Sequence, residues 1–213
     1  IESAQRKVEG HNFDIRKRLV DFDDVINEHR MVIYGEREKV LLGADTRSNV
    51  LAMLLAEIEK HTKSVDTSNF ESLELLQNEL RELFLPEDLP SLEEMQALRS
   101  ELTDELLDRA EDRYEAIEEK IGAEGMRAVE KWLLLESIDT HWREHLTAIE
   151  DTRNSIGLQA YAQIDPLVAF KREGYDMFNQ LQDNIRRQVA RTIFKVRVVE
   201  QTPAAAPPPP SIT

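Results

Sequence analysis

Cysteine is absent from this 213-residue chain, and glycine, aromatic residues and long apolar runs are scarce. Without cysteine the chain can form neither disulfides nor thiolate metal sites, which weakly favours a cytoplasmic protein. No apolar run approaches the roughly 18 residues that a membrane-spanning helix requires, and no secretory signal opens the chain. Alternating β-branched stretches between turn residues are also lacking, so strand signals are nearly absent.

The composition and the apolar spacing of the chain are typical of helices. Leucine, glutamate, arginine and alanine are abundant, and apolar residues recur at spacings of three and four along most of the chain. A hydrophobic content of 41% is sufficient for a sizeable core in one or two domains. We therefore predict an all-α fold that consists of one long helix, a small acidic group of helices and an antiparallel two-helix hairpin.

The formal net charge of −15 is unevenly distributed along the chain. Residues 1–42 carry −1, residues 43–153 carry −16 and residues 154–213 carry +2. An acidic middle argues against nucleic acid as a partner, because phosphate contacts depend on lysine and arginine. The basic residues of the last helix suggest a solvated face, an acidic protein surface or an anionic membrane as their surroundings; they are Arg186, Arg187, Arg191, Lys195 and Arg197.

A helix of about 40 residues is predicted for the N-terminal segment, residues 1–43. Its apolar stripe consists of Ala4, Val8, Ile15, Leu19, Phe22, Ile26, Ile33 and Val40. Such a helix would be roughly 60 Å long, which exceeds the core of a small domain, and Gly43 supplies a stop. The chain begins with Ile1 rather than methionine and is helical in pattern from the start. We therefore expect it to be a piece of a larger protein.

Shorter helices are predicted in the acidic region, at residues 50–58, 70–84 and 102–121. Residues 85–90 contain two prolines and should break the helix. Ser91 and Glu94 have the spacing of a capping box that opens the next helix. The Pro- and Ala-rich tail, residues 201–213, is predicted to be a linker with nothing to bury.

Two long amphipathic helices, spanning roughly residues 124–199, are predicted to form the hairpin. Their stripes consist of Ala128, Trp132, Leu135, Ile138, Trp142, Leu146 and Ile149 on the first helix, and Leu167, Phe170, Met177, Phe178, Leu181, Ile185, Val189, Val196 and Val199 on the second. We expect both tryptophans to anchor the core, and Asp165 with Pro166 to start the second helix. The connector, residues 154–164, places apolar groups at an exposed tip, which favours contact with a partner.

Three motifs resemble those of SecA, the ATP-driven motor family of bacterial protein export. They are AQRKVE, NFDIRK and DDV within residues 4–25; residues 133–149 with Asp139, Trp142 and Glu144; and residues 157–173 with YAQIDP and FKRE. The resemblance implies a scaffold helix (1–43), a helical wing (44–122), a scaffold continuation with a two-helix finger (123–200, tip about 154–164) and a linker (201–213). It covers about residues 1–200.

The resemblance also implies how this region acts. The finger would enter the mouth of the SecY channel, where Tyr161, with Ile156, Gly157 and Leu158, would contact the translocating polypeptide. The long helix would pass nucleotide-driven motion to the finger, and the finger would restrain ATPase activity. Contacts with the nucleotide-binding domains are expected from the polar residues of the long helix: Asn12, Asp14, Arg16 and Asp24.

Cofactors and partners follow from the same resemblance. None of the seven glycines is followed by lysine, so the phosphate-binding loop G-x-x-x-x-G-K-[ST] is missing and we expect no ATP chemistry in this chain alone. ATP and Mg²⁺ would belong to the parent protein. The implied partners are the SecY complex, unfolded preproteins, the SecA nucleotide-binding domains, an anionic lipid surface and a second copy in a homodimer. The implied location is the cytoplasm, peripheral to the plasma membrane.

Two other interpretations of the residues remain open. The chain could be a stand-alone helical adaptor that binds a partner through its hairpin, without a motor. His141, Glu144 and His145 match the H-x-x-E-H pattern of zinc proteases, but a third ligand is not evident, and we expect His145 to pack or to form a hydrogen bond instead. Asp21, Asp23 and Asp24 indicate a solvated or domain-contacting face rather than a catalytic cluster.

Overall fold

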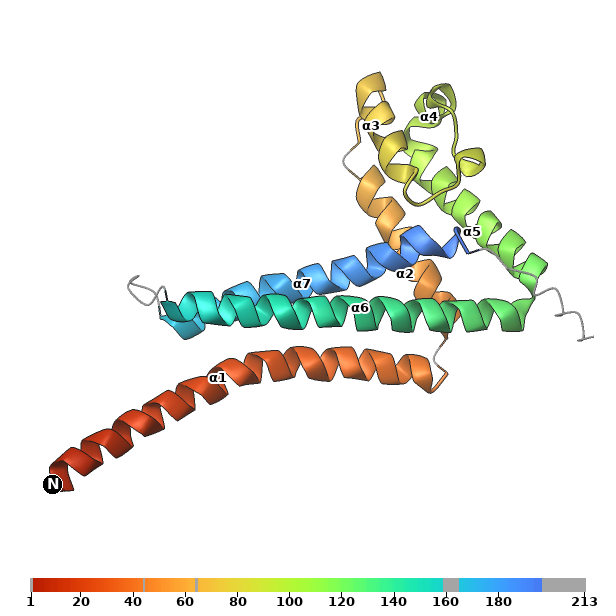
Figure 1. Ribbon diagram of the computed structural model, residues 1–213. Coiled ribbons are helices and arrows are strands. Elements are labelled where there is room, and N and C mark those ends of the chain that lie inside the picture. Colours follow the sequence, from red (N-terminus) through yellow and green to blue (C-terminus); the bar gives the residue numbers. More distant parts are fainter. Residues whose placement is uncertain (1, 44, 64, 159–164, 197–213) are drawn as a thin grey trace, which may run out of the picture.

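The computed structural model describes residues 2–43, 45–63, 65–158 and 165–196, which fold almost entirely into helices. Three long helices lie side by side along one direction, and a group of shorter helices projects from one end of them (Figure 1). No β-strand occurs in these ranges, so the predicted all-α class is confirmed. The elements are α1 (Glu2–Leu41), α2 (Thr46–Thr62), α3 (Phe70–Leu80), η1 (Pro86–Asp88), α4 (Leu92–Leu98), η2 (Arg99–Glu101), α5 (Leu102–Ile121), α6 (Ala123–Leu158) and α7 (Pro166–Ile193).

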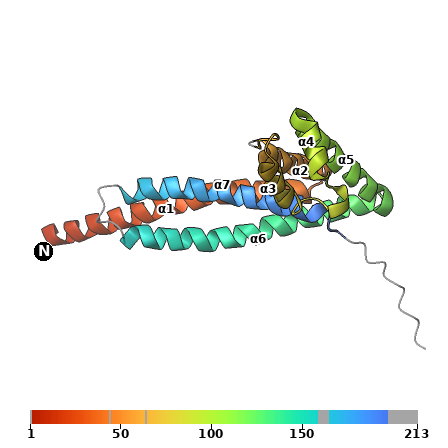
Figure 2. The same cartoon turned by 90° about the horizontal axis from the view of Figure 1, so that it is seen from above.

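The long N-terminal helix forms as predicted but is packed along only part of its length. Its second half lies against α6 and α7, whereas its N-terminal part diverges from α6 in Figure 1 and extends past the end of the hairpin in both views (Figures 1 and 2). Of the predicted stripe, Ile26, Ile33 and Val40 are buried, but Val8 and Leu19 are exposed. The side chains of Ala4 and Ile15 lie outside the described residues. We call residues 2–20 the arm of α1.

Local capping explains why the short helices begin where they do. Asp45 accepts a hydrogen bond from the Ser48 amide, and Asn69 accepts one from the Glu71 amide. Ser91 and Glu94 form the predicted capping box at the start of α4. The predicted break at residues 85–90 is confirmed, and α3 ends earlier than expected, at Leu80.

The short helices share one hydrophobic core with the base of the hairpin. Leu54 and Ile58 of α2 belong to the same buried cluster as Leu133 of α6 and Ile193 of α7. The remaining buried members include Leu73, Leu76, Leu80, Met95, Leu106, Met126, Val189 and Phe194. Because burial of apolar side chains is the main stabilising force in such a cluster, α2–α5 and the hairpin base form one packed unit.

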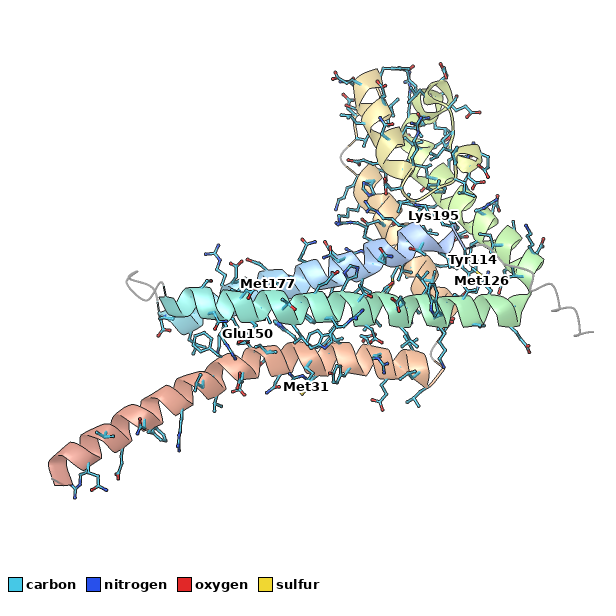
Figure 3. The ribbon with its side chains drawn as sticks, in the orientation of Figure 1. Met31, Tyr114, Met126, Glu150, Met177 and Lys195 are labelled. Carbon is cyan, nitrogen blue, oxygen red and sulfur yellow. The ribbon has the colours of Figure 1, made fainter. Side chains whose placement is uncertain are left out.

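A buried carboxylate joins three helices within this unit. Glu130 of α6 is fully buried and accepts hydrogen bonds from Tyr114 of α5 and from Thr46 of α2, whose Oγ1 lies 2.6 Å away. Figure 3 shows Tyr114 near the junction of α5 and α6. Arg127 lies 3.0 Å from Glu130, so the buried charge is paired. Burial, reinforced by Glu130, raises the pKa of Tyr114 above its ordinary value.

The basic face of α7 meets the acidic short helices of this same chain. Arg186 donates to Glu57 of α2 over 3.3 Å, and the Glu57 side chain is fully buried. Lys195 donates to the main-chain oxygen of Glu82 over 2.9 Å, beneath the short helices (Figure 3). Arg197 lies outside the described residues. A solvated face, an acidic protein surface and an anionic membrane were the three surroundings expected for these cations. For the described residues the structure shows an acidic protein surface, and that surface belongs to the short helices of this same chain.

The hairpin differs from its prediction at both ends. Asp165 caps α7 and Pro166 occupies its first turn, as expected. However, α6 continues to Leu158, so the first part of the predicted connector is helical. The helix α7 ends at Ile193, and Val199 lies outside the described residues. Trp142 is buried, but Trp132 is 58% exposed, so its prediction as a core anchor is wrong.

The shared core predicts cooperative unfolding of the short helices with the hairpin. Replacing the buried Leu54 by Ala should lower the free energy of unfolding by about 2–5 kcal/mol, because the substitution leaves a cavity. Chemical denaturation should show one transition when followed by helix content and by tryptophan fluorescence. The exposed Leu75→Ala on α3 should change the free energy by less than about 0.5 kcal/mol. Two separated transitions would show that the short helices fold independently.

Candidate functional site

The free end of the hairpin is the predicted contact site, and the structure describes it in part. Ile156 is on α6 and packs, partly buried, against a cluster that contains Val25, Ile26, Ile149 and Phe170. This corrects the expectation that Ile156 lies in an exposed connector. Gly157 and Leu158 form the end of α6, and Tyr161 lies outside the described residues. Ile156 therefore anchors the end of the helix.

Two apolar clusters join α1 to both helices of the hairpin. The cluster nearer the free end contains Val25, Ile26, Ile149 and Phe170, with Phe22, Leu146, Ile156 and Met177 packed against it. The second cluster, nearer the short helices, contains Ile33, Ile138, Trp142, Leu181 and Ile185. Each cluster combines side chains from α1, α6 and α7. The three helices are therefore held together along the second half of α1 by these two apolar clusters, and we call this three-helix contact the seam.

Gly174 allows α7 to approach α1 closely. A Cβ at this position would lie 3.1 Å from Val25 Cγ1, 3.6 Å from His29 Cε1 and 3.8 Å from Ile149 Cδ1. The first of these distances is shorter than ordinary van der Waals contact. Val25 and Ile149 are themselves buried, so they have little room to move away. The glycine thus sets the spacing of the seam where the three helices meet.

Ion pairs between α1 and α6 flank the apolar seam. Arg37 donates from Nε to Asp139 Oδ1 over 2.9 Å and from Nη2 to Asp139 Oδ2 over 3.3 Å, a bidentate arrangement. Towards the free end, Arg153 donates to Asp23 over 3.0 Å. Lys131 donates to the main-chain oxygen of Leu41 over 3.0 Å, at the end of α1. These contacts fix the register of α1 on α6.

A pair of buried histidines lies in the middle of the seam. His29 Nδ1 of α1 is 3.1 Å from His145 Nε2 of α6, and the two side chains come from positions 116 residues apart. The Phe178 ring of α7 stacks on His29 with ring centroids 4.5 Å apart. Burial lowers the pKa of His29, against an opposing effect of Glu28. Burial and then the neighbouring His29 lower the pKa of His145 to about 4.

The zinc-like histidine pattern is divided between two environments. His145 faces His29 within the seam, whereas His141 Nδ1 lies 2.9 Å from Glu144 Oε2 on the helix surface. Among the described residues, no group of three or more histidines, aspartates or glutamates is placed to hold a metal ion. The hydrogen bond expected for His145 is confirmed, and its partner His29 was not identified from the sequence.

The arm of α1 presents the residues expected to contact other domains, separately from the hairpin end. Asn12 and Arg16 are exposed on the arm, Asp24 is exposed further along α1, and the side chain of Asp14 lies outside the described residues. The arm also exposes the apolar residues Val8, Phe13, Leu19 and Val20, with Phe13 66% exposed. The arm can therefore contribute both polar and apolar contacts to a partner.

Several residues that hold the seam together could not be identified from the sequence. They are His29, Arg37, Asp139 as the partner of Arg37, Arg153 and Gly174. Each acts through a contact with another helix, and a single sequence does not fix the register between helices distant in the chain. The apolar spacing on α1 was the one available signal, since Ile26 and Ile33 mark the packed face.

Comparisons with known proteins identify the relatives of this chain. A family model described as the SecA Wing and Scaffold domain matches residues 1–197. The protein translocase subunit SecA of Dehalococcoides mccartyi is 43% identical over 203 residues, which is 93% of this chain and 21% of that protein. The SecA subunit of Roseiflexus sp. is 42% identical over 92% of this chain and 20% of that protein. The SecA subunit of Alkaliphilus oremlandii is 37% identical over 97% of this chain and 24% of that protein. The chain thus spans about a fifth to a quarter of these relatives.

The close approach at Gly174 gives a testable difference between two glycines. Gly35 lies on α1, where an added Cβ would meet no heavy atom of the described residues within 4 Å, so Gly35→Ala should stabilise the helix by about 0.5–1 kcal/mol. Gly174→Ala gains the same helix propensity but crowds Val25, and its free energy of unfolding should be about 1–3 kcal/mol below that of Gly35→Ala. Denaturant titration of both variants measures this difference. Equal stabilities would contradict the tight seam.

Proposed function

Because the chain belongs to the SecA wing and scaffold family, we propose that it is the scaffold, wing and finger part of a motor for ATP-driven preprotein translocation through the SecY channel. The observation that carries the proposal is the match over residues 1–197, together with a hairpin clamped to a long helix. In this proposal α1 is the scaffold helix, α2–α5 are the wing, and α6 with α7 combine the scaffold continuation with the two-helix finger. The chain covers only part of its relatives, so the rest of the motor supplies the ATP and Mg²⁺ site.

Transmission of motion is the role that the seam supports best. The arm of α1 exposes Phe13, Val20 and the polar residues Asn12 and Arg16, which are suited to contacts with the nucleotide-binding domains; Asp14 and Asp24 extend this surface. The second half of α1 is joined to the finger by two apolar clusters and by the Arg37–Asp139 and Arg153–Asp23 pairs. A displacement of the arm would therefore move the finger with it, because a packed helix transmits strain.

Contact with the translocating polypeptide is assigned to the finger end. Tyr161 would hold varied sequences through its ring and hydroxyl group, since a tyrosine is large, rigid and amphipathic. Gly157 and Leu158 precede it at the end of α6. Ile156 takes a positioning role instead, because it packs against the Val25 and Phe170 cluster. The proposed partners are thus the SecY complex and an unfolded preprotein.

Location and assembly follow as parts of the same proposal. Within the described residues, no helix has the length and apolar character needed to cross a membrane. We place the protein at the cytoplasmic face of the plasma membrane as a peripheral component. Anionic lipids and a second copy remain further proposed partners, although Arg186 and Lys195 are already engaged by the wing. By this proposal the chain itself is not an enzyme.

Cross-linking tests the role of the finger end. A single cysteine at Tyr161, in the full-length motor with its other cysteines removed, should cross-link to a preprotein arrested in translocation. The cross-link should require both ATP and the channel. Glu93→Cys on the wing is the matched control, because Glu93 is exposed and its side chain is not one of the two that form the Ser91–Glu94 capping box. Equal labelling at both positions would favour the adaptor role, in which the loop is only a turn.

A measurement of ATP hydrolysis tests whether this chain restrains turnover and whether the arm is its contact with the nucleotide-binding domains. Adding this chain to separately produced SecA nucleotide-binding domains should lower their basal ATP hydrolysis. Phe13→Asp should weaken the apparent affinity of this effect by at least about fivefold, roughly 1 kcal/mol, because it places a charge in an apolar contact. Leu75→Asp on the wing, also at an exposed position, should leave the effect unchanged. Unchanged turnover at saturating chain would exclude the restraining role.

A further inference from the structure

The histidine pair at the centre of the seam has an unusual setting for two titratable groups. His29 is 7% exposed and His145 is 5% exposed. Their nitrogens are 3.1 Å apart, and Phe178 and Trp142 cover them, with the Trp142 ring stacked on His145 at 5.5 Å between centroids. The pair therefore joins α1 to α6 under an aromatic cover from α6 and α7.

The hydrogen bond between the two rings depends on their protonation. A neutral imidazole carries one N–H and one acceptor nitrogen, so two neutral rings can share one proton between Nδ1 and Nε2. If both rings are charged, both facing nitrogens carry hydrogen and the bond is lost. Two positive charges would then lie close together in an apolar setting, which is strongly unfavourable.

The charged groups around the pair offer little compensation. On α1, Glu28 lies next to His29 in sequence and raises its pKa, but burial dominates. On α6, Glu144 is next to His145 in sequence but is paired with His141, and Asp139 and Arg153 are paired with Arg37 and Asp23 respectively. On α7, the neighbouring groups are Phe178 and the backbone at Gly174, which are uncharged. Among the described residues, we find no carboxylate bonded to either histidine ring.

We propose that His29 and His145 form a proton-sensitive joint that holds α1 against the finger while both rings are neutral and loosens when they become charged. The joint is a property of this chain and does not depend on the translocation role. Arg37, Asp139 and the apolar clusters hold the ends of the seam, so loosening affects the middle of the seam, around His29, first. The joint thus makes the coupling between α1 and the finger dependent on pH.

The direction of the pH effect follows from the burial of the two rings. In an open joint the rings would take up protons near their ordinary pKa of about 6.5, whereas the closed joint resists protonation. The closed form is therefore at full stability above about pH 6.5 and loses stability as the pH falls. Each extra proton bound by the open form changes the ratio of closed to open form by up to about tenfold per pH unit. The loss levels off below the pKa of the closed form, which is about 4 for His145.

A distance measurement across the seam tests the joint. Met31 of α1 and Tyr175 of α7 are exposed, and Figure 3 shows Met31 pointing away from the hairpin, so Met31→Cys and Tyr175→Cys can carry spin labels in this cysteine-free chain. The distance distribution should stay narrow between about pH 8 and pH 7 and broaden to longer distances towards about pH 4. The same labels on the variant His29→Gln with His145→Gln should give a distribution that changes much less over this range.

Equal broadening in the labelled chain with and without the two histidines would overturn the proposal, because carboxylates elsewhere would then be responsible. Nitrogen NMR of the unsubstituted chain, without spin labels, gives a second test that does not depend on the folding of a variant. His29 and His145 should titrate below about pH 6.5 and influence each other, whereas an uncoupled pair with ordinary pKa values would also overturn it.

Discussion

The packing of the second half of α1 against both helices of the hairpin is the constraint on which the rest of the structure depends. Gly174 brings α7 close to Val25, and two apolar clusters extend the contact on either side. The Arg37–Asp139 pair then fixes the register. Because this seam covers only part of α1, it leaves the arm exposed while it holds the rest of α1 against the hairpin.

The wing is joined to the same framework through the base of the finger. Its core is continuous with side chains of α6 and α7, and its acidic residues neutralise the basic face of α7. The uneven charge of the chain thus has a structural meaning, since Glu57 is buried against Arg186. The short helices and the hairpin base therefore form one packed unit at one end of the molecule, and the arm of α1 extends past the other end of the hairpin (Figure 1).

The helices could be predicted well from the sequence, and their mutual contacts poorly. Spacing and capping located the helices, and Ser91 and Asp165 act as predicted, because caps depend on neighbours in sequence. Trp132 was assigned to the core from a periodicity that holds for Trp142 but fails towards the start of α6, where the contact face of the helix changes. The pairing of His29 with His145 depends on the register between distant helices, which local pattern does not encode.

Amide hydrogen exchange along α1 tests the central claim most directly, because protection reports local stability. The account predicts that residues 22–41 exchange as slowly as the packed parts of α6 and α7, whereas residues 2–20 exchange much faster in the isolated chain. Uniformly fast exchange along all of α1 would contradict it, since the helix would then not be clamped to the finger. Uniformly slow exchange would contradict the exposed arm.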